Sequence, residues 1–128
     1  MATVLLATDS VHTTAAACDY LGERLGAEDT VVVLTVRTDV VSERDAGDAA
    51  NVARTRLFEP TVETVQRGAD DETAAVAAAI RAVAAETDAD EIVLGRVSGD
   101  PERAGEPPGS TATAVLETAS RPVVLVAP

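Results

Sequence analysis

Five short runs of strand-forming residues constrain the fold of this chain more than any other feature. Three of them, TVLLA, TVVVLTV and VVLVA, are continuous, apolar and rich in β-branched residues, as is typical of strands buried on both faces. A fourth is short and apolar, and the remaining one is partly polar, which favours a position near a sheet edge. The predicted strands occupy residues 3–7, 30–36, 61–67, 91–94 and 123–127, of which 61–67 is the partly polar run.

A helical pattern fills each interval between these runs. The first helix is expected to end at Gly26 as its C-cap, and the last to place Leu116 on its apolar face. The second is expected to include Phe58 and to end before Pro60. The first helix is expected up to residue 26 and the second over roughly the second half of residues 39–60. The third is expected from the acidic residues 70–72 to about residue 86, and the fourth over residues 111–119.

Strands that alternate with helices at this spacing predict a single α/β domain over residues 1–128. Because crossovers between parallel strands are right-handed, the economical topology is a doubly wound, five-stranded parallel sheet with helices on both faces.

The charge balance excludes several classes of partner. The formal net charge is −12, and all ten basic residues are arginine. Such a field repels nucleic acid and anionic membranes, and it destabilises the compact state unless salt screens it. No apolar run approaches the roughly 18 residues that a membrane span needs, and the single Cys18 fits a reducing compartment. We therefore expect a soluble, cytoplasmic protein, from a halophilic microbe and stabilised by salt.

Polar residues follow the carboxyl ends of the first two predicted strands, where ligands bind in open parallel sheets. Asp9 can accept hydrogen bonds from ribose hydroxyls, and the main chain at Val36 can bind the polar edge of adenine. The alternative for this first turn is purely structural, with Asp9 or Ser10 capping the following helix.

A glycine-rich loop follows the fourth predicted strand. Gly95 and Gly99 permit a close approach of the backbone to a ligand, and Gly109 with Ser110 offers N–H groups at the start of the last helix. Strand, glycine loop and helix start together are an arrangement that binds phosphate. The structural alternative is that Ser110 only caps the last helix.

Four segments carry a resemblance to the universal stress protein family over essentially the whole chain: VLLATDS, VVVLTV, GRVSGDPERAGEPPGS and RPVVLVAP. The resemblance implies an adenine nucleotide alpha hydrolase-like fold with strand order 3-2-1-4-5. Nucleotide-binding members carry Gly-x2-Gly-x9-Gly-Ser/Thr after the fourth strand. Here Gly99 and Gly109-Ser110 match the second half of this motif, whereas three residues, and not two, separate Gly95 from Gly99.

By this resemblance the ligand is ATP or AMP, with Mg²⁺ if it is ATP. Asp9 and Gly95 would hold the ribose, Val36 the adenine, and Gly99, Gly109 and Ser110 the phosphates. The interior of the loop departs from the family, because it carries the carboxylates of residues 100, 102 and 106 and prolines that lack an N–H at 101, 107 and 108. A dimeric interaction module that binds no nucleotide is therefore the alternative function.

The remaining features do not indicate an efficient enzyme. His12 lies close to Ser10, but neighbouring positions at a helix start rarely form a nucleophile–base pair, and a surface histidine is the expected outcome. One His and one Cys cannot build the usual zinc site. A nucleotide hydrolase or adenylyl-transfer enzyme is the third hypothesis, with slow ATP hydrolysis the most that the resemblance implies.

The last predicted strand suggests a protein partner. It runs from Val123 to Ala127, and only Pro128 follows it to cover a sheet edge. An exposed apolar edge invites pairing with another chain. In universal stress proteins the last strand commonly mediates homodimerisation, so the resemblance implies a homodimer through residues 123–127; the alternative is an edge blunted by Pro128.

Overall fold

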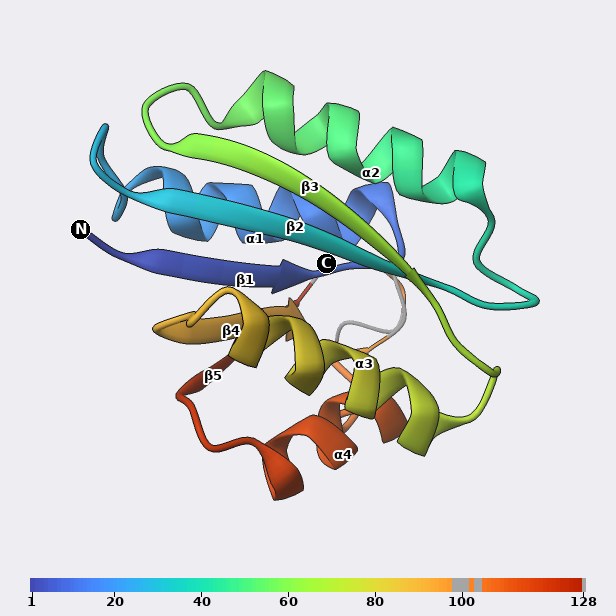
Figure 1. The fold of residues 1–128 in the computed structure, drawn as a ribbon. Helices are drawn as coiled ribbons and strands as arrows, with labels where there is room; N and C mark the ends of the chain where they lie inside the picture. Colours follow the sequence, from blue (N-terminus) through green and yellow to red (C-terminus); the bar gives the residue numbers. More distant parts are fainter. Residues whose placement is uncertain (98–101, 103–104, 128) are drawn as a thin grey trace.

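Five strands and four helices alternate along the chain in a computed structural model that describes residues 1–97, 102 and 105–127 (Figure 1). The strands are β1 Thr3–Ala7, β2 Thr30–Arg37, β3 Thr61–Gly68, β4 Glu91–Gly95 and β5 Val123–Val126. The helices are α1 Val11–Gly22, α2 Glu43–Arg56, α3 Thr73–Glu86 and α4 Ser110–Thr118.

The strands form one parallel sheet in the order β3-β2-β1-β4-β5, which confirms the predicted fold and strand order. The partly polar β3 lies at one edge, as expected, and β5 lies at the other. At the centre, Ala7 of β1 pairs with Leu34 of β2 on one side and with Leu94 of β4 on the other. The order of the strands therefore reverses beside β1, which is where open sheets of this kind bind ligands.

Helices cover both faces of the sheet, with α1 and α2 on one side and α3 and α4 on the other (Figure 1). Successive residues of β1 point to opposite faces. Leu5 packs into the core that contains Ile80 of α3 and Val115 of α4, whereas Leu6 packs into the core that contains Leu21 of α1. The central strand is thus buried on both sides, as its continuous apolar run predicts.

Serine side chains start the first two helices. The Ser10 hydroxyl accepts the Thr13 N–H at 3.1 Å at the start of α1. Ser42 and Asp45 form a reciprocal capping box at the start of α2. This box begins α2 at Glu43, well before the position expected from its apolar residues alone.

Three local expectations are wrong. The first helix ends at Gly22, so Gly26 is not its C-cap; the Gly26 N–H instead donates to the Asp29 carboxylate at 2.8 Å. Phe58 lies beyond the end of α2 and is 85% exposed. Leu116 is 46% exposed, because α4 buries a narrow face whose fully buried members are Ala112 and Val115.

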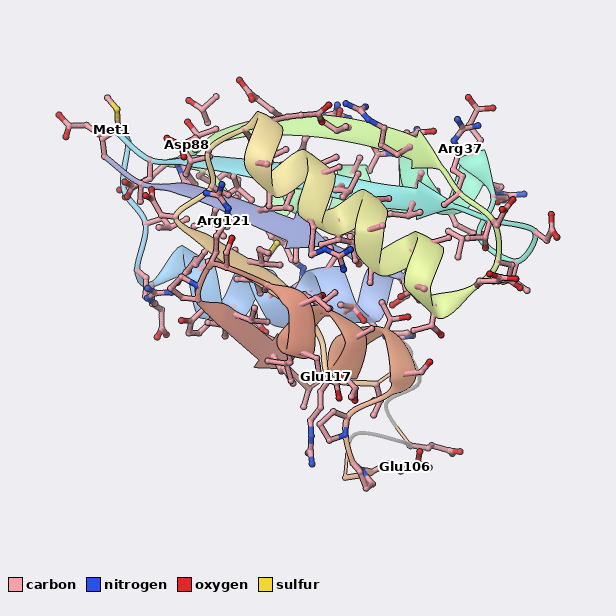
Figure 2. The ribbon with its side chains drawn as sticks, turned by 60° about the horizontal axis from the view of Figure 1, so that its bottom comes forward. Met1, Arg37, Asp88, Glu106, Glu117 and Arg121 are labelled. Carbon is pink, nitrogen blue, oxygen red and sulfur yellow. The ribbon has the colours of Figure 1, made fainter. Side chains whose placement is uncertain are left out.

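Side chains hydrogen-bond to the main chain of the loops at the amino ends of the strands. The Asp29 carboxylate accepts N–H groups from Ala2 at 2.7 Å and from Gly26 at 2.8 Å, which joins the start of β1 to the turn before β2. Figure 2 shows Met1 at this end of the molecule and Arg37, which closes β2, at the opposite end.

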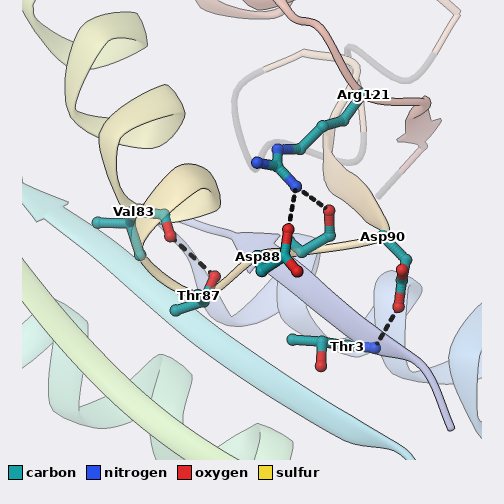
Figure 3. Close-up of polar contacts among 7 residues, drawn as sticks. Thr3, Val83, Thr87, Asp88, Asp90 and Arg121 are labelled. Atoms are coloured by element: carbon teal, nitrogen blue, oxygen red, sulfur yellow. Dashed lines mark hydrogen bonds and ion pairs between the residues drawn. The ribbon is translucent and has the colours of Figure 1, made fainter.

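The turn between α3 and β4 is held in the same way (Figure 3). The Arg121 guanidinium donates to the Ala89 carbonyl and lies 3.5 Å from the Asp88 carboxylate. Asp88 has a φ of 50°, which is a left-handed conformation that a short polar residue tolerates. The Thr3 N–H donates to the Asp90 carboxylate at 2.8 Å, so this turn is also tied to β1.

Candidate functional site

A cavity of about 330 Å³ opens at the carboxyl ends of β1, β2 and β4. Five of the six residues predicted to bind a nucleotide line it: Asp9, Val36, Gly95, Gly109 and Ser110. The sixth, Gly99, lies outside the described residues. The volume falls in the range of small-molecule sites, and the position is the point at which the strand order reverses.

The register of the sheet turns the polar main chain of Val36 toward the cavity. The Leu34 carbonyl accepts the Thr8 N–H at 2.9 Å on the side of β1, and the Arg37 carbonyl accepts the Ala69 N–H at 2.9 Å on the side of β3. Because main-chain groups alternate sides along a strand, the N–H and C=O of Val36 point to the β1 side, like those of Leu34. Pairing between β1 and β2 has ended there, so a donor and an acceptor stand side by side at the cavity.

Hydroxyl groups hold the turn between β1 and α1. The Ser10 hydroxyl donates to Thr13 Oγ1 at 3.1 Å while it accepts the Thr13 N–H. The hydroxyls of Thr8 and Thr14 are 2.9 Å apart and buried. Ser10 is therefore the cap of α1, and the adjacent Asp9 is left to line the cavity.

The Asp9 carboxyl is accessible at the mouth of the cavity, yet the protein around it removes part of its water. This desolvation raises the pKa of Asp9 above its ordinary value, and the charge of Asp45 raises it further, while a backbone hydrogen bond at Asp9 lowers it. A carboxylate kept at such a position lowers the stability of the fold at neutral pH, which is a feature of binding and catalytic residues.

Gly95 brings β4 into close contact with the first turn of α1. A Cβ atom at this position would lie 3.0 Å from both Cγ2 and Oγ1 of Thr13 and 3.1 Å from the Val97 carbonyl oxygen. Thr13 is only 1% exposed, so it has little room to move. Glycine is therefore required here by packing between two walls of the cavity, independently of any ligand.

The start of α4 forms another wall of the cavity. Gly109 is its N-cap and Ser110 its first helical residue, so Ser110 does not cap this helix. No side chain hydrogen-bonds to the first turn, and Ser110, Thr111 and Ala112 all line the cavity. The partial positive charge of a helix N-terminus thus faces the cavity without an internal partner, which favours an anion.

The two described acidic residues of the β4–α4 connection are exposed. Glu106 lies at the periphery of the molecule (Figure 2), and Glu102 is also exposed; neither lines the cavity. Asp100 and Pro101 lie outside the described residues.

Sequence reasoning missed six polar residues that line the cavity, among them Thr13, Asp71 and Arg96. The hydroxyl-rich segment TDSVHTT was a signal for Thr13, since a threonine three residues after an N-cap serine faces the same turn. Arg96 directly follows Gly95, so its place in the strand-end loop was readable. Asp71 reaches the cavity from the start of α3, and only the packing of α3 on the sheet brings it there.

Other chemical groups are structural or exposed. His12 is exposed, and the Ser10 hydroxyl donates to Thr13 and not to this histidine. Cys18 is buried, and burial raises the pKa of its thiol to about 11, so it is a packed, unreactive side chain. Within the described residues, no group of three or more His, Cys, Asp and Glu side chains is arranged to hold a metal ion.

None of the helices in the described ranges has the length and apolar character needed to cross a membrane.

Solved structures with the same architecture match nearly the whole chain, although no protein-family model and no curated protein sequence does. A universal stress protein in complex with cAMP is 21% identical, with a TM-score of 0.70, and the match covers 98% of this chain and 95% of that one. Hypothetical protein MJ0577 is 16% identical, with a TM-score of 0.74 and coverage of 97% and 94%. Protein Rv1636 from Mycobacterium tuberculosis H37Rv is 24% identical, with a TM-score of 0.59 and coverage of 98% and 94%. The chain therefore shares its fold with a universal stress protein.

Proposed function

We propose that this chain is a universal-stress-type protein that binds an adenine nucleotide in the cavity and acts as a regulator through its bound state. One observation carries the proposal: Asp9, Val36, Gly95, Gly109 and Ser110, selected from the sequence, surround one cavity at the switch point of the sheet. A fold neighbour crystallised with cAMP adds support, because it shows that the shared fold accommodates an adenine nucleotide.

The walls of the cavity suit the three parts of such a ligand. The N–H of Val36 would donate to a ring nitrogen of adenine, and its C=O would accept from the exocyclic amine. The Asp9 carboxylate would accept hydrogen bonds from ribose hydroxyls. The N-terminal turn of α4 would bind phosphate oxygens. If the ligand were ATP, the cavity carboxylates of Asp9 and Asp71 would be the described side chains available to its Mg²⁺.

Binding would join β1, β2 and α4, which meet at the cavity. A ligand that binds only the folded protein stabilises it by an amount that grows with the logarithm of the ligand concentration over Kd. The bound state would therefore be a more rigid form of the carboxyl end of the sheet, and a partner protein would distinguish it from the free form.

The direct test is to denature the purified protein and quantify any released nucleotide, then to measure binding by calorimetry in high salt. Asp9→Ala is expected to weaken binding about tenfold or more, because a hydrogen bond to a charged group is worth roughly 1.5–3 kcal/mol. Asp70→Ala is the matched control, since Asp70 is exposed, carries the same charge and does not line the cavity. Absence of binding by adenosine, cAMP, AMP and ATP alike would rule the proposal out.

Homodimerisation through β5 is the second part of the proposal. This edge strand keeps Val123, Val124 and Leu125 only partly buried. The Pro122 carbonyl accepts the Ile92 N–H on the side of β4, so by alternation the main-chain groups of Val123 and Leu125 point away from β4. An unpaired apolar edge of this kind is suited to pairing with a second copy.

Sedimentation velocity of the wild type and of Val123→Pro tests the dimer. The substitution removes an N–H that points away from β4, so pairing within the sheet is kept while pairing at the edge is weakened. A wild-type monomer across the concentration range would refute the dimer without affecting the nucleotide proposal. If dimers form but no nucleotide binds, the chain is instead a dimeric interaction module.

A further inference from the structure

We propose that the edge strand β3 is a second surface for self-association, on which two copies of the chain pair antiparallel about a two-fold axis at Val65. This surface is independent of the nucleotide site and of β5, which lies at the other edge of the sheet (Figure 1). Three features of β3 carry the proposal: its regularity, the direction of its main-chain groups and the order of its charges.

β3 lacks the features that commonly protect an edge strand from pairing. It pairs with β2 over its whole length, from Thr61 to Gly68, without a bulge. It contains no proline and no lysine. Six of its eight residues are exposed, and β2 is its only partner among the described strands. A full-length edge is therefore open to another chain.

Every second residue of β3 directs its N–H and C=O away from the sheet. The N–H groups of Thr61 and Ala69 donate to the carbonyls of Asp29 and Arg37, both at 2.9 Å, on the side of β2. Because main-chain groups alternate sides along a strand, the residues that point outward are 62, 64, 66 and 68. The outward carbonyl of Gln66 accepts the guanidinium of the next residue at 3.1 Å, a bond that an exposed side chain can exchange for a main-chain donor.

Antiparallel pairing of these outward groups limits the possible registers. Residues that exchange hydrogen bonds must face each other, so an even-numbered residue of one copy faces an even-numbered residue of the other. With the axis at Val65, Thr64 faces Gln66 of the second copy, and Glu63 faces its Arg67. Axes at Thr64 or Gln66 place neither charge opposite the other, and axes at Glu63 or Arg67 place like charges opposite each other. The strand is thus complementary to itself in charge only when the axis is at Val65.

The side chains on the α3 side of β3 suit this register. Val65 lies between the two charges and packs against the core that contains Ile80 of α3. The Glu63 carboxylate has no ion pair with a described residue. The Arg67 guanidinium lies 3.3 Å from the Glu86 carboxylate, and these two side chains are 48% and 58% exposed. A second copy would therefore give Glu63 a partner and place Arg67 between two carboxylates.

Such an interface would be weak. The paired area is one strand edge, and exposed ion pairs contribute little individually. Two copies that each carry a net charge of −12 also repel one another until salt screens the charge. We therefore expect reversible dimers at high protein concentration and not a permanent complex.

Charge reversal on a Val123→Pro background, in which pairing through β5 is weakened, tests the register. Sedimentation velocity at one salt concentration should show dimers for the background. Glu63→Arg and Arg67→Glu, each added singly, should weaken dimerisation about tenfold, because each puts like charges opposite each other at two places. An equimolar mixture of the two reversed proteins should associate like the background, since their charges are again complementary. Glu23→Arg at the end of α1 is the matched control, with the same charge change at an exposed position outside β3.

A disulfide at the axis tests the register without any change of charge. Residues that face each other without exchanging hydrogen bonds have Cα atoms about 4.5 Å apart, within the range of disulfides. Val65→Cys should therefore form cross-linked dimers under mild oxidation, read on a non-reducing gel. Thr61→Cys, on the same face of β3, should not, because the register separates it from its copy along the strand. The native Cys18 is buried, and thermal melts confirm that each variant is folded.

Each outcome supports or overturns the β3 pairing. Stronger association of Glu63→Arg than of the background, with weaker association of Arg67→Glu, would show that net charge alone governs association. A mixture of the reversed proteins that stays monomeric, or a Val65→Cys variant that cross-links no faster than Thr61→Cys, would also overturn the pairing. A monomeric Val123→Pro background with a dimeric wild type would overturn it and leave the β5 dimer in place. Nucleotide binding is measured separately by calorimetry and does not depend on these results.

Discussion

Asp29 and Asp9 lie at opposite ends of the sheet and affect the stability of the fold in opposite ways. Asp29 precedes β2, and the N–H groups of Gly26 and Ala2 that it accepts lower the pKa of its carboxyl. Asp9 follows β1, and burial raises the pKa of its carboxyl. The first carboxylate therefore stabilises the folded chain, whereas the second destabilises it. The comparison separates an end where a carboxylate stabilises the fold from an end where a carboxylate lines a cavity at a cost in stability.

The surroundings of the two carboxylates follow the same division. At the amino end, Arg121 and Asp90 close the α3–β4 turn with hydrogen bonds to main-chain groups (Figure 3). At the carboxyl end, the first turn of α4 and the main chain of Val36 keep donors and an acceptor directed at a cavity. Four substitutions, taken in order of decreasing expected effect, test whether this division is real.

Gly95→Ala should have the largest effect, because its Cβ would clash with the buried Thr13 and with the Val97 carbonyl. We expect a loss of about 1–3 kcal/mol in the free energy of unfolding, the usual cost of overpacking. Urea denaturation measures it. Gly105→Ala is the control, since this glycine is exposed and nothing lies within 4 Å of the added atom. Equal stability of Gly95→Ala and the wild type would mean that the cavity walls move apart easily.

Asp29→Asn should lower the melting temperature at pH 7, because the amide keeps only one oxygen for the N–H groups of Ala2 and Gly26. The folded-state pKa of Asp29 is lowered, so its contribution is present above the unfolded value of about 3.9 and is lost as pH falls through the folded value. Melts between pH 2 and 7 should therefore show the two proteins converging in acid. A difference that does not depend on pH would exclude this electrostatic origin.

Asp9→Asn should act in the opposite direction and by a smaller amount, raising the melting temperature at pH 7. The folded-state pKa of Asp9 is raised, so its ionisation costs stability as pH rises from about 3.9 through the folded value, and below 3.9 the cost is absent. The gain should thus appear only above about pH 4. Asp70→Asn changes the net charge equally at an exposed position off the cavity. An equal gain from Asp70→Asn would show that only net charge matters.

Arg56→Ala should have the smallest effect on stability, although it breaks an ion pair near the amino end of the sheet. The Arg56 guanidinium lies 3.5 Å from the Asp19 carboxylate, but the two side chains are 51% and 77% exposed. Exposed pairs contribute about 0–1 kcal/mol, so the change in unfolding free energy should be within about 0.5 kcal/mol. A larger loss would mean that surface ion pairs, and not bonds to the main chain, stabilise this end of the sheet.

Much of the fold was predictable because strand and helix patterns are local. The continuous runs predicted β1, β2 and β5, and the partly polar run predicted the edge strand β3. Helix ends were less predictable, since several neighbouring residues can serve as caps. Gly26 was expected to end α1, but Asp29 binds its N–H instead. Phe58 was expected on α2 and lies beyond its last turn.

For the candidate site, the sequence predicted which segments meet but not how their groups are directed. Asp9 and Ser10 were equal candidates for the cap of α1, and only the bonds to Thr13 decide for Ser10. The direction of the Val36 main chain depends on pairing with β1 and β3. The contact between Thr13 and Gly95 joins residues that are far apart in the chain.

By itself the sequence determined the alternation of strands and helices, the charge and the residue types at the strand ends. These properties depend on the order of neighbouring residues, through apolar periodicity and turn preference. The tertiary structure alone decided that Asp9 is partly desolvated, that Gly95 has no room for a side chain, and that α4 begins without a capping side chain at the cavity. Desolvation, close packing and free donors depend on atoms from distant segments, which only the folded chain brings together.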